Sequence, residues 1–226
     1  MEQAWIATRL GCLLLAAGGG TRLGGGKLLL PWQGRALVAH ALSAVLEAGE
    51  FLSLGLVLGH GAEAVRACLE NDSALSRQLH YILNPAWQEG QSSSLRSGLA
   101  ALCALPQGAQ MQAVLVMLGD QPLIAPATLR TLCLAHAGAV LHDASHLATA
   151  PVFEGRRGNP VILSRGLFEA IFALQGDIGA RQILQGLGAD LLGVPVDDAG
   201  VVHDVDSPEA YADLQALSCP RPIRLS

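Results

Sequence analysis

The chain has 226 residues, a formal net charge of −5 at pH 7 and 51% hydrophobic residues, so one domain with a large buried core is expected. It has no basic run of the kind that nucleic-acid binding needs, and its early apolar stretch from Leu10 to Ala17 is too short to span a bilayer and lacks the flanks of a signal peptide. Neither nucleic acid nor a membrane is therefore expected as a partner. The five cysteines are scattered and never spaced as metal ligands, which indicates reduced thiols in a cytoplasmic protein.

In the first half of the chain, apolar runs typical of strands alternate with stretches of helical periodicity. Strands are expected at residues 10–15, 52–58, 80–83 and 113–118, and helices at residues 36–48, 62–69, 94–105 and 126–137. Continuous apolar strands separated by helices indicate a mostly parallel sheet that is covered on both faces. The predicted fold class is therefore α/β, a three-layer α/β/α arrangement with a Rossmann-like sheet.

The second half is less regular. Strands are expected at residues 160–163 and 191–196, and helices at residues 167–174, 178–187 and 208–217. We expect a single domain over residues 1–218, with a nucleotide-binding part at about 8–125 and an acceptor-binding part at about 147–196 that caps the site. The proline-containing end, residues 219–226, is expected to be a frayed tail.

A glycine-rich loop follows the first predicted strand. It fails the P-loop spacing, because Thr21 stands where the first glycine is required and Leu28 follows Lys27, and it fails the dinucleotide spacing at Leu23. Backbone N–H groups of such loops can approach phosphate oxygens closely. The two cations of the loop, Arg22 and Lys27, lie five residues apart and suit a triphosphate, because they can neutralise its charge. The alternative is a flexible glycine turn with solvated charges.

The loop and the residues after it resemble a known signature, L-A-A-G-x-x-x-R-x-G-x-x-K-x-L-L-P. The matching segments are Leu15-Ala16-Ala17-Gly18, Arg22-Leu23-Gly24, Lys27 and Leu29-Leu30-Pro31. The signature belongs to the nucleotidyltransferases of molybdenum cofactor maturation, the MobA-like NTP transferases, and the resemblance continues over nearly the whole chain. It implies a sheet of the nucleotide-diphospho-sugar transferase type. It also implies nucleotide binding by Leu15, Ala16, Ala17, Gly18 and Gly19. Arg22 and Lys27 are expected to bind the phosphates and to be catalytic, because they would stabilise charge on the leaving pyrophosphate.

Two acidic motifs are candidates for a Mg²⁺ site. Asp120 follows an apolar strand, at the edge where α/β sheets bind ligands, and the family's G-D-x-P motif implies that it binds the metal and is catalytic. The segment from Asp204 to Glu209 resembles the family's D-x-D-T-P-E-D, which implies that Asp206 is the second metal ligand and Asp204 its partner. The alternatives are a turn aspartate for Asp120 and, for Ser207-Pro208-Glu209, an ordinary helix start.

Three further segments match family motifs near the substrates. The first is N-P-x-W-x-x-G-x-x-S-S-L, which implies nucleotide contacts by Ser92, Ser93 and Ser94, although the serines equally suit a capped helix start; Gln121 is expected to contact the base. The others are R-R-G-H-P-V, in which Asn159 replaces the histidine, and G-D-x-G-A-R. They imply an acceptor site formed by Arg156, Arg157, Asn159, Asp177 and Arg181. Arg181 suits a phosphate, and Asp177 alternatively caps a helix.

His142 and His146 have the i, i+4 spacing of metal ligands, but no third ligand is evident and the residues between them suit a turn. The Ala16-Ala17-Gly18 form of the loop is the one that the resemblance associates with cytidylyl transfer. The expected activity is therefore Mg²⁺-dependent transfer of CMP from CTP to a phosphorylated pterin cofactor, with a molybdoenzyme or its chaperone as an implied partner. The alternatives are GTP or another phosphorylated acceptor, an oxidoreductase on this scaffold, and a non-catalytic nucleotide-binding or chaperone-like module.

Overall fold

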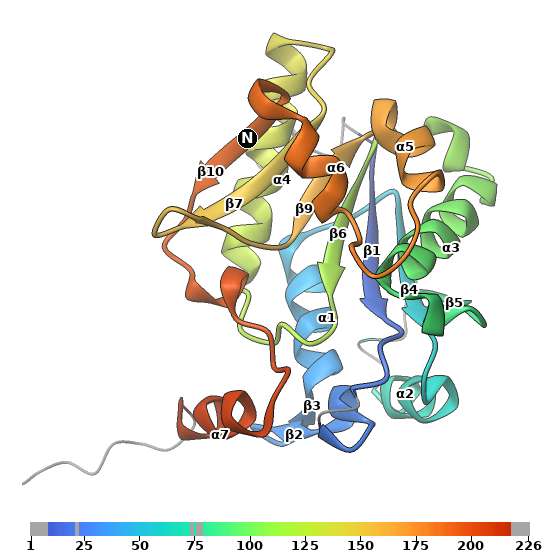
Figure 1. Cartoon of the computed structure of the whole chain (residues 1–226), viewed down its shortest axis with the longest axis vertical. Coiled ribbons are helices and arrows are strands. Elements are labelled where there is room, and N and C mark those ends of the chain that lie inside the picture. The colour runs from blue at the N-terminus through green and yellow to red at the C-terminus, as the bar shows by residue number, and fades with distance from the viewer. Residues whose placement is uncertain (1–8, 21–22, 73–74, 76–78, 218–226) are drawn as a thin grey trace, which may run out of the picture.

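The computed structural model describes residues 9–20, 23–72, 75 and 79–217, so Arg22, Cys219 and the predicted tail lie outside the described residues. Its centre is an eight-stranded sheet with the order β10-β7-β9-β6-β1-β4-β5, in which β8 pairs with β7 (Figure 1). The strands are β1 (Leu10–Ala16), β4 (Ser53–Leu58), β5 (Leu79–Leu83), β6 (Ala113–Leu118), β7 (Ala148–Phe153), β8 (Arg156–Arg157), β9 (Val161–Ser164) and β10 (Leu191–Pro195). A separate hairpin joins β2 (Pro31–Trp32) to β3 (Arg35–Ala36).

The sheet is mostly parallel, as predicted. β1 pairs in parallel with β4 and β6, β4 with β5, and β10 with β7, whereas β9 is antiparallel to both β6 and β7. The helices are α1 (Leu37–Ala48), α2 (Ala62–Glu70), α3 (Gln91–Ala104), α4 (Pro126–His142), α5 (Phe168–Phe172), α6 (Arg181–Gly186) and α7 (Pro208–Leu217).

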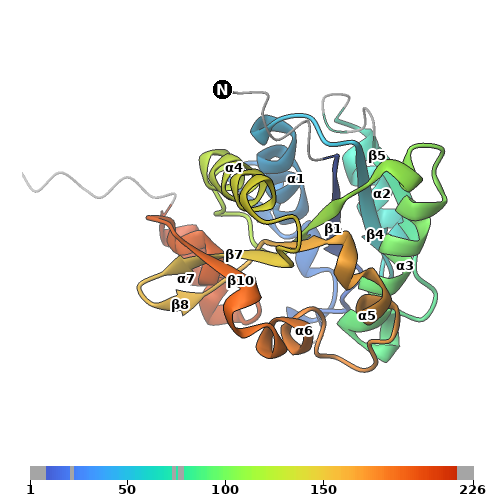
Figure 2. The same cartoon turned by 90° about the horizontal axis from the view of Figure 1, so that it is seen from above.

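Two hydrophobic cores lie on opposite faces of the sheet. Cys12 and Leu14 of β1 point into the core formed with α1, α2 and α4, while Leu13 and Leu15 point into the core formed with α3, α5 and α6. Figure 2 shows α1 and α4 on one side of the sheet and α3 and α5 on the other. Because β1 is buried on both faces, its sequence is continuously apolar, and the three-layer α/β/α prediction is confirmed.

Several predicted boundaries were wrong. Helix α3 begins at Gln91 rather than at residue 94, α4 continues to His142, and α6 is shorter than predicted. Strands β7 and β8 and the β2–β3 hairpin were missed. β7 contains Pro151, which weakens a strand pattern. The predicted cap region, residues 147–196, contributes β7, β9 and β10 to the central sheet and also contains α5 and α6.

Candidate active site

The site lies where the chain changes direction across the sheet. From β1 the chain moves to β4 on one side and later returns to form β6 on the other, so the carboxyl ends of β1 and β6 are adjacent. The Gly119 N–H donates to the Leu15 carbonyl at 2.9 Å, which places Asp120 beside the start of the glycine-rich loop. Open α/β sheets bind ligands at such a switch point.

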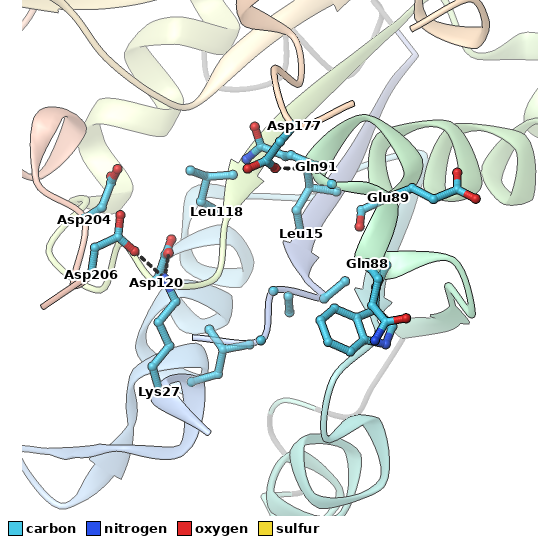
Figure 3. A pocket seen from close by; sticks show the side chains of 18 residues that line it. Leu15, Lys27, Gln88, Glu89, Gln91, Leu118, Asp120, Asp177, Asp204 and Asp206 are labelled. Carbon is cyan, nitrogen blue, oxygen red and sulfur yellow. Dashed lines mark hydrogen bonds and ion pairs between the residues drawn. The ribbon is translucent and has the colours of Figure 1, made fainter. Parts of the chain in front are cut away.

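Lys27 lies between two carboxylates that come from distant parts of the chain (Figure 3). Its Nζ is 2.5 Å from Asp120 Oδ2 and 2.5 Å from Asp206 Oδ1. Gly26, in the left-handed conformation (φ 72°), begins the short helical turn that carries Lys27, and buried Leu28 anchors this turn. Burial lowers the pKa of Lys27, but the two ion pairs outweigh burial and the net pKa is raised. The lysine is therefore a fixed positive charge at the carboxyl ends of β1 and β6.

Asp120 has one oxygen without a protein partner. Oδ1 is buried and makes no hydrogen bond to any described residue, although a buried carboxylate oxygen normally has a partner. The described residues contain no group of three or more His, Cys, Asp or Glu placed to hold a metal. Mg²⁺ usually takes one or two carboxylates and completes its shell with water and substrate phosphates, so Asp120 and Asp206 fit this ion.

Asp204 connects this cluster to a neighbouring polar residue. The Gln121 Nε2 donates to Asp204 Oδ1 at 2.5 Å, and the Val205 N–H donates to the Asp120 carbonyl at 3.1 Å, which holds the segment of Asp204 and Asp206 beside β6. Burial raises the pKa of Asp204, and the nearby Asp120 raises it further. These two hydrogen bonds explain how residues more than 80 positions apart in the sequence form one site.

A pocket of about 530 Å³, which we call the Lys27 pocket, opens at this cluster. It contains the predicted nucleotide residues Leu15, Ala16, Ala17, Gly18, Gly19 and Lys27, together with Trp87, Gln88, Glu89, Gly90, Gln91, Ser94, Leu118, Asp120, Asp177, Asp204 and Asp206. The wall from Trp87 to Glu89 was not among the predicted site residues. The sequence signal that could have found it is the tryptophan of the N-P-x-W-x-x-G-x-x-S-S-L motif, which Trp87 matches.

The three predicted serines have different environments. Ser94 lines the Lys27 pocket, whereas Ser92 and Ser93 are buried and are absent from its lining. The Ser93 hydroxyl donates to the Gly90 carbonyl at 2.8 Å, and the buried Asn84 side chain donates to Ser93 Oγ at 2.9 Å. The serines lie inside α3 and do not cap it, because the helix begins three residues earlier than predicted.

A second pocket of about 790 Å³, the Arg181 pocket, adjoins the first. It brings together all five predicted acceptor residues, Arg156, Arg157, Asn159, Asp177 and Arg181. Gln121, predicted to contact the nucleotide base, lines this pocket and not the Lys27 pocket. Five residues line both pockets and form their shared wall: Leu15, Gln91, Leu118, Asp177 and Asp204. A ligand in one pocket therefore lies next to a ligand in the other.

The histidine pair is not part of either pocket. His142 is the last residue of α4, and His146 Nε2 lies 3.0 Å from Thr149 Oγ1. The turn predicted between them is present, because the Ser145 N–H donates to Asp143 Oδ1. In the part of the chain that is described, no helix combines the length and apolar character that a membrane crossing requires.

The fold and the paired carboxylates at its switch point define a nucleotide-binding α/β protein of the nucleotidyltransferase kind. Residues 12–191 match the MobA-like NTP transferase domain. Nicotine blue oxidoreductase of Paenarthrobacter nicotinovorans is 34% identical over 201 residues, which cover 87% of this chain and 92% of that protein. The chain belongs to the MobA-like NTP transferase family.

Solved structures show the same fold. The complex of Rv0371c from Mycobacterium tuberculosis with manganese has a TM-score of 0.69 and 27% identity, and the comparison covers 92% of this chain and 99% of that one. The 4-diphosphocytidyl-2C-methyl-D-erythritol synthase of Anaerococcus prevotii has a TM-score of 0.71 over 95% of this chain and 98% of that one, but at 16% identity this likeness concerns the fold alone.

Proposed function

We propose that this chain is a Mg²⁺-dependent nucleotidyltransferase that moves CMP from CTP to the phosphate of a molybdenum cofactor, with release of pyrophosphate. The observation that carries the proposal is the placement of Lys27, Asp120 and Asp206 together at the carboxyl ends of β1 and β6. The adjoining arginine-lined pocket supports a second, phosphorylated substrate. The manganese complex of a similar protein supports a divalent metal.

The reaction needs positioning and charge stabilisation more than covalent help from the protein. A phosphate oxygen of the acceptor bonds to the α-phosphorus of CTP, the bond from that phosphorus to the bridging oxygen breaks, and pyrophosphate leaves with the electron pair. Lys27 faces the growing negative charge, and Arg181 with Arg156 and Arg157 orients the acceptor phosphate. That phosphate is already ionised, so no general base is required. Mg²⁺ held by Asp120 and Asp206 would neutralise the triphosphate.

The proposed preference for CTP rests in part on Ala17. Its side chain lies in the wall of the Lys27 pocket, and the Ala17 carbonyl accepts a hydrogen bond from the His60 N–H at 3.1 Å, so this part of the loop is fixed. A methyl group here leaves less room for a purine than for a pyrimidine. Because one methyl group contributes only about 1–3 kcal/mol to selection, other residues of the pocket must contribute as well.

A second candidate activity comes from one comparison, the similarity to a protein named nicotine blue oxidoreductase. Against it stand the loop spacing, which does not suit a dinucleotide, and the joint presence of Lys27, Asp120 and Asp206, which suits a metal-bound triphosphate. The test supplies CTP or GTP with molybdenum cofactor, and separately NADH or NADPH with a redox dye as the electron acceptor, each with Mg²⁺ present and absent. We expect acceptor-dependent pyrophosphate release with CTP and Mg²⁺. Oxidation of NADH or NADPH without pyrophosphate release would favour the oxidoreductase.

A further inference from the structure

Helix α3 is capped by a segment that lies far away in the sequence. The Gln91 N–H donates to Asp177 Oδ1 at 2.9 Å, across 86 positions of the chain, and the Ser92 N–H donates to the Gly176 carbonyl at 3.2 Å. Gly90, at the N-cap position, has no side chain that could serve this purpose. The segment 174–180, which we call the capping loop, therefore satisfies two of the free N–H groups at the start of this 14-residue helix, those of Gln91 and Ser92.

The close approach of the two segments depends on glycine. A Cβ atom on Gly90 would lie 2.6 Å from the Cα of Asp177, and Gly90 also has a positive φ of 101°. On the other side, Gly176 and Gly179 have positive φ values of 73° and 56°. Because backbone cannot give way as a flexible side chain does, any larger residue at position 90 would push the capping loop off the helix.

This contact is also the shared wall of the two pockets. Gln91 and Asp177 line the Lys27 pocket, where Figure 3 shows them side by side, and both also line the Arg181 pocket. Ser94, which lies three residues after Gln91, faces the Lys27 pocket, and Arg181, which begins α6 directly after the capping loop, faces the Arg181 pocket. A shift of the capping loop would therefore move residues of both pockets together.

We propose that Asp177 is a positioning residue that couples the two pockets by holding the capping loop against the start of α3. The carboxylate acts through the Gln91 N–H and not on the acceptor, and its negative charge suits the helix N-terminus. With these N–H groups occupied, a substrate phosphate is directed instead to Lys27 or Arg181. The inference rests on the proposed function, since it assigns the Lys27 pocket to the nucleotide.

Amide hydrogen exchange tests the coupling without an acceptor. Exchange is followed in peptides that cover residues 90–95, 175–181 and the glycine-rich loop, with and without CTP and MgCl₂. In the wild type, CTP should slow exchange in all three. In Asp177→Ala, residues 90–95 and 175–181 should exchange about fivefold to tenfold faster, as expected when a cap is lost. Residues 175–181 should then no longer respond to CTP, although the glycine-rich loop still does.

Three variants separate positioning from other roles. Asp177→Asn keeps the oxygen that accepts from Gln91 and should behave almost as the wild type. Gly179→Ala keeps the Asp177 carboxylate but disturbs the capping loop, because Gly179 has a positive φ of 56° and an added Cβ would collide with Gln91 Oε1. It should weaken the response of residues 175–181 to CTP as Asp177→Ala does. Asp143→Ala is the matched control, because Asp143 accepts a similar bond from the Ser145 N–H at 2.9 Å but lines neither pocket; its exchange pattern at the site should equal the wild type.

The outcomes are distinguishable. If CTP protects the glycine-rich loop but residues 175–181 respond equally in the wild type and in Asp177→Ala, or if Asp177→Asn is as impaired as Asp177→Ala, the positioning role is overturned while the nucleotide site stands. If CTP protects none of the three regions in the wild type, the nucleotide assignment fails, and the proposed coupling fails with it.

Discussion

The Lys27 pocket and the Arg181 pocket share a wall but are built in different ways. The first rests on β1 and β6, which are buried over nearly their whole length, and Asp120 stands two residues after the end of β6. The second depends on the exposed two-residue strand β8, on the six-residue helix α6 and on the capping loop. The sheet therefore fixes the position of Asp120, whereas the geometry around Arg181 depends on a few bonds between distant segments.

We expect the largest loss of activity from a substitution in the Lys27 pocket, at Asp120. Asp120→Asn should leave folding intact, because the Asp120 carbonyl still accepts from the Val205 N–H. Turnover should fall by about 10²- to 10⁴-fold, as expected when transition-state charge loses its stabilisation. Steady-state pyrophosphate release and thermal unfolding measure the two effects. Near-normal turnover would remove Asp120 from the site.

A substitution of Lys27 tests whether the Lys27 pocket stabilises the transition state as well as binding the nucleotide. Lys27→Ala should lower kcat by about 10²-fold, because charge grows on the departing pyrophosphate. Kinetics at varied CTP with saturating acceptor separate kcat from KM. A rise in KM with unchanged kcat would make Lys27 a binding residue only.

The free energy of unfolding of the protein should depend on pH through His136. This buried histidine of α4 lies 3.1 Å from Thr149 of β7, and burial lowers its pKa from 6.5 to about 4, with His146 adding to the shift. The unfolded chain therefore binds this proton first, so the contribution is fully present above pH 6.5 and is lost as the pH falls towards 4. The loss is about 3 kcal/mol.

Denaturant unfolding at pH 7 and pH 4.5 measures this effect in the wild type and in His136→Asn. The variant should lose most of its pH dependence in this range, whereas His80→Asn, which changes an exposed histidine, should keep it. Equal pH dependence in His136→Asn and the wild type would contradict the assignment.

Binding of the acceptor in the Arg181 pocket should depend on the shape of the Arg181 side chain. Arg181→Lys keeps the charge but loses the planar fork, so KM for the acceptor should rise by roughly tenfold while the affinity for CTP stays nearly constant. Arg66→Lys, on the exposed face of α2 and paired with Glu70, is the control. A drop in CTP affinity for Arg181→Lys would place this arginine in the nucleotide site.

The smallest expected change concerns the base. Ala17→Gly should narrow the preference for CTP over GTP, by no more than the roughly 10- to 200-fold that one methyl group contributes, and should not fully reverse it. The measurement is kcat/KM for both nucleotides with the same acceptor. A wild type that prefers GTP would overturn the cytidylyl assignment and leave the nucleotidyltransferase assignment standing.

The sequence predicted the strands that support the Lys27 pocket better than the contacts between distant segments that shape the Arg181 pocket. Continuous apolar runs were sufficient for β1, β4 and β6, and hence for the position of Asp120 at a strand end. The start of α3 was wrong because its cap comes from Asp177, and a similar distant cap joins Asp198 to the Ala125 N–H at the start of α4. Local rules cannot find such partners. Neither could spacing reveal that Gln121 bonds Asp204 and faces the Arg181 pocket.

The most direct test of the central claim is to identify the products formed from CTP, Mg²⁺ and molybdenum cofactor by mass spectrometry, with pyrophosphate measured in the same reaction. We expect a cofactor that has gained one CMP, one pyrophosphate for each product formed, and no product when EDTA removes the metal. Cofactor that stays unmodified, or CTP turnover that continues unchanged in EDTA, would overturn the proposed activity.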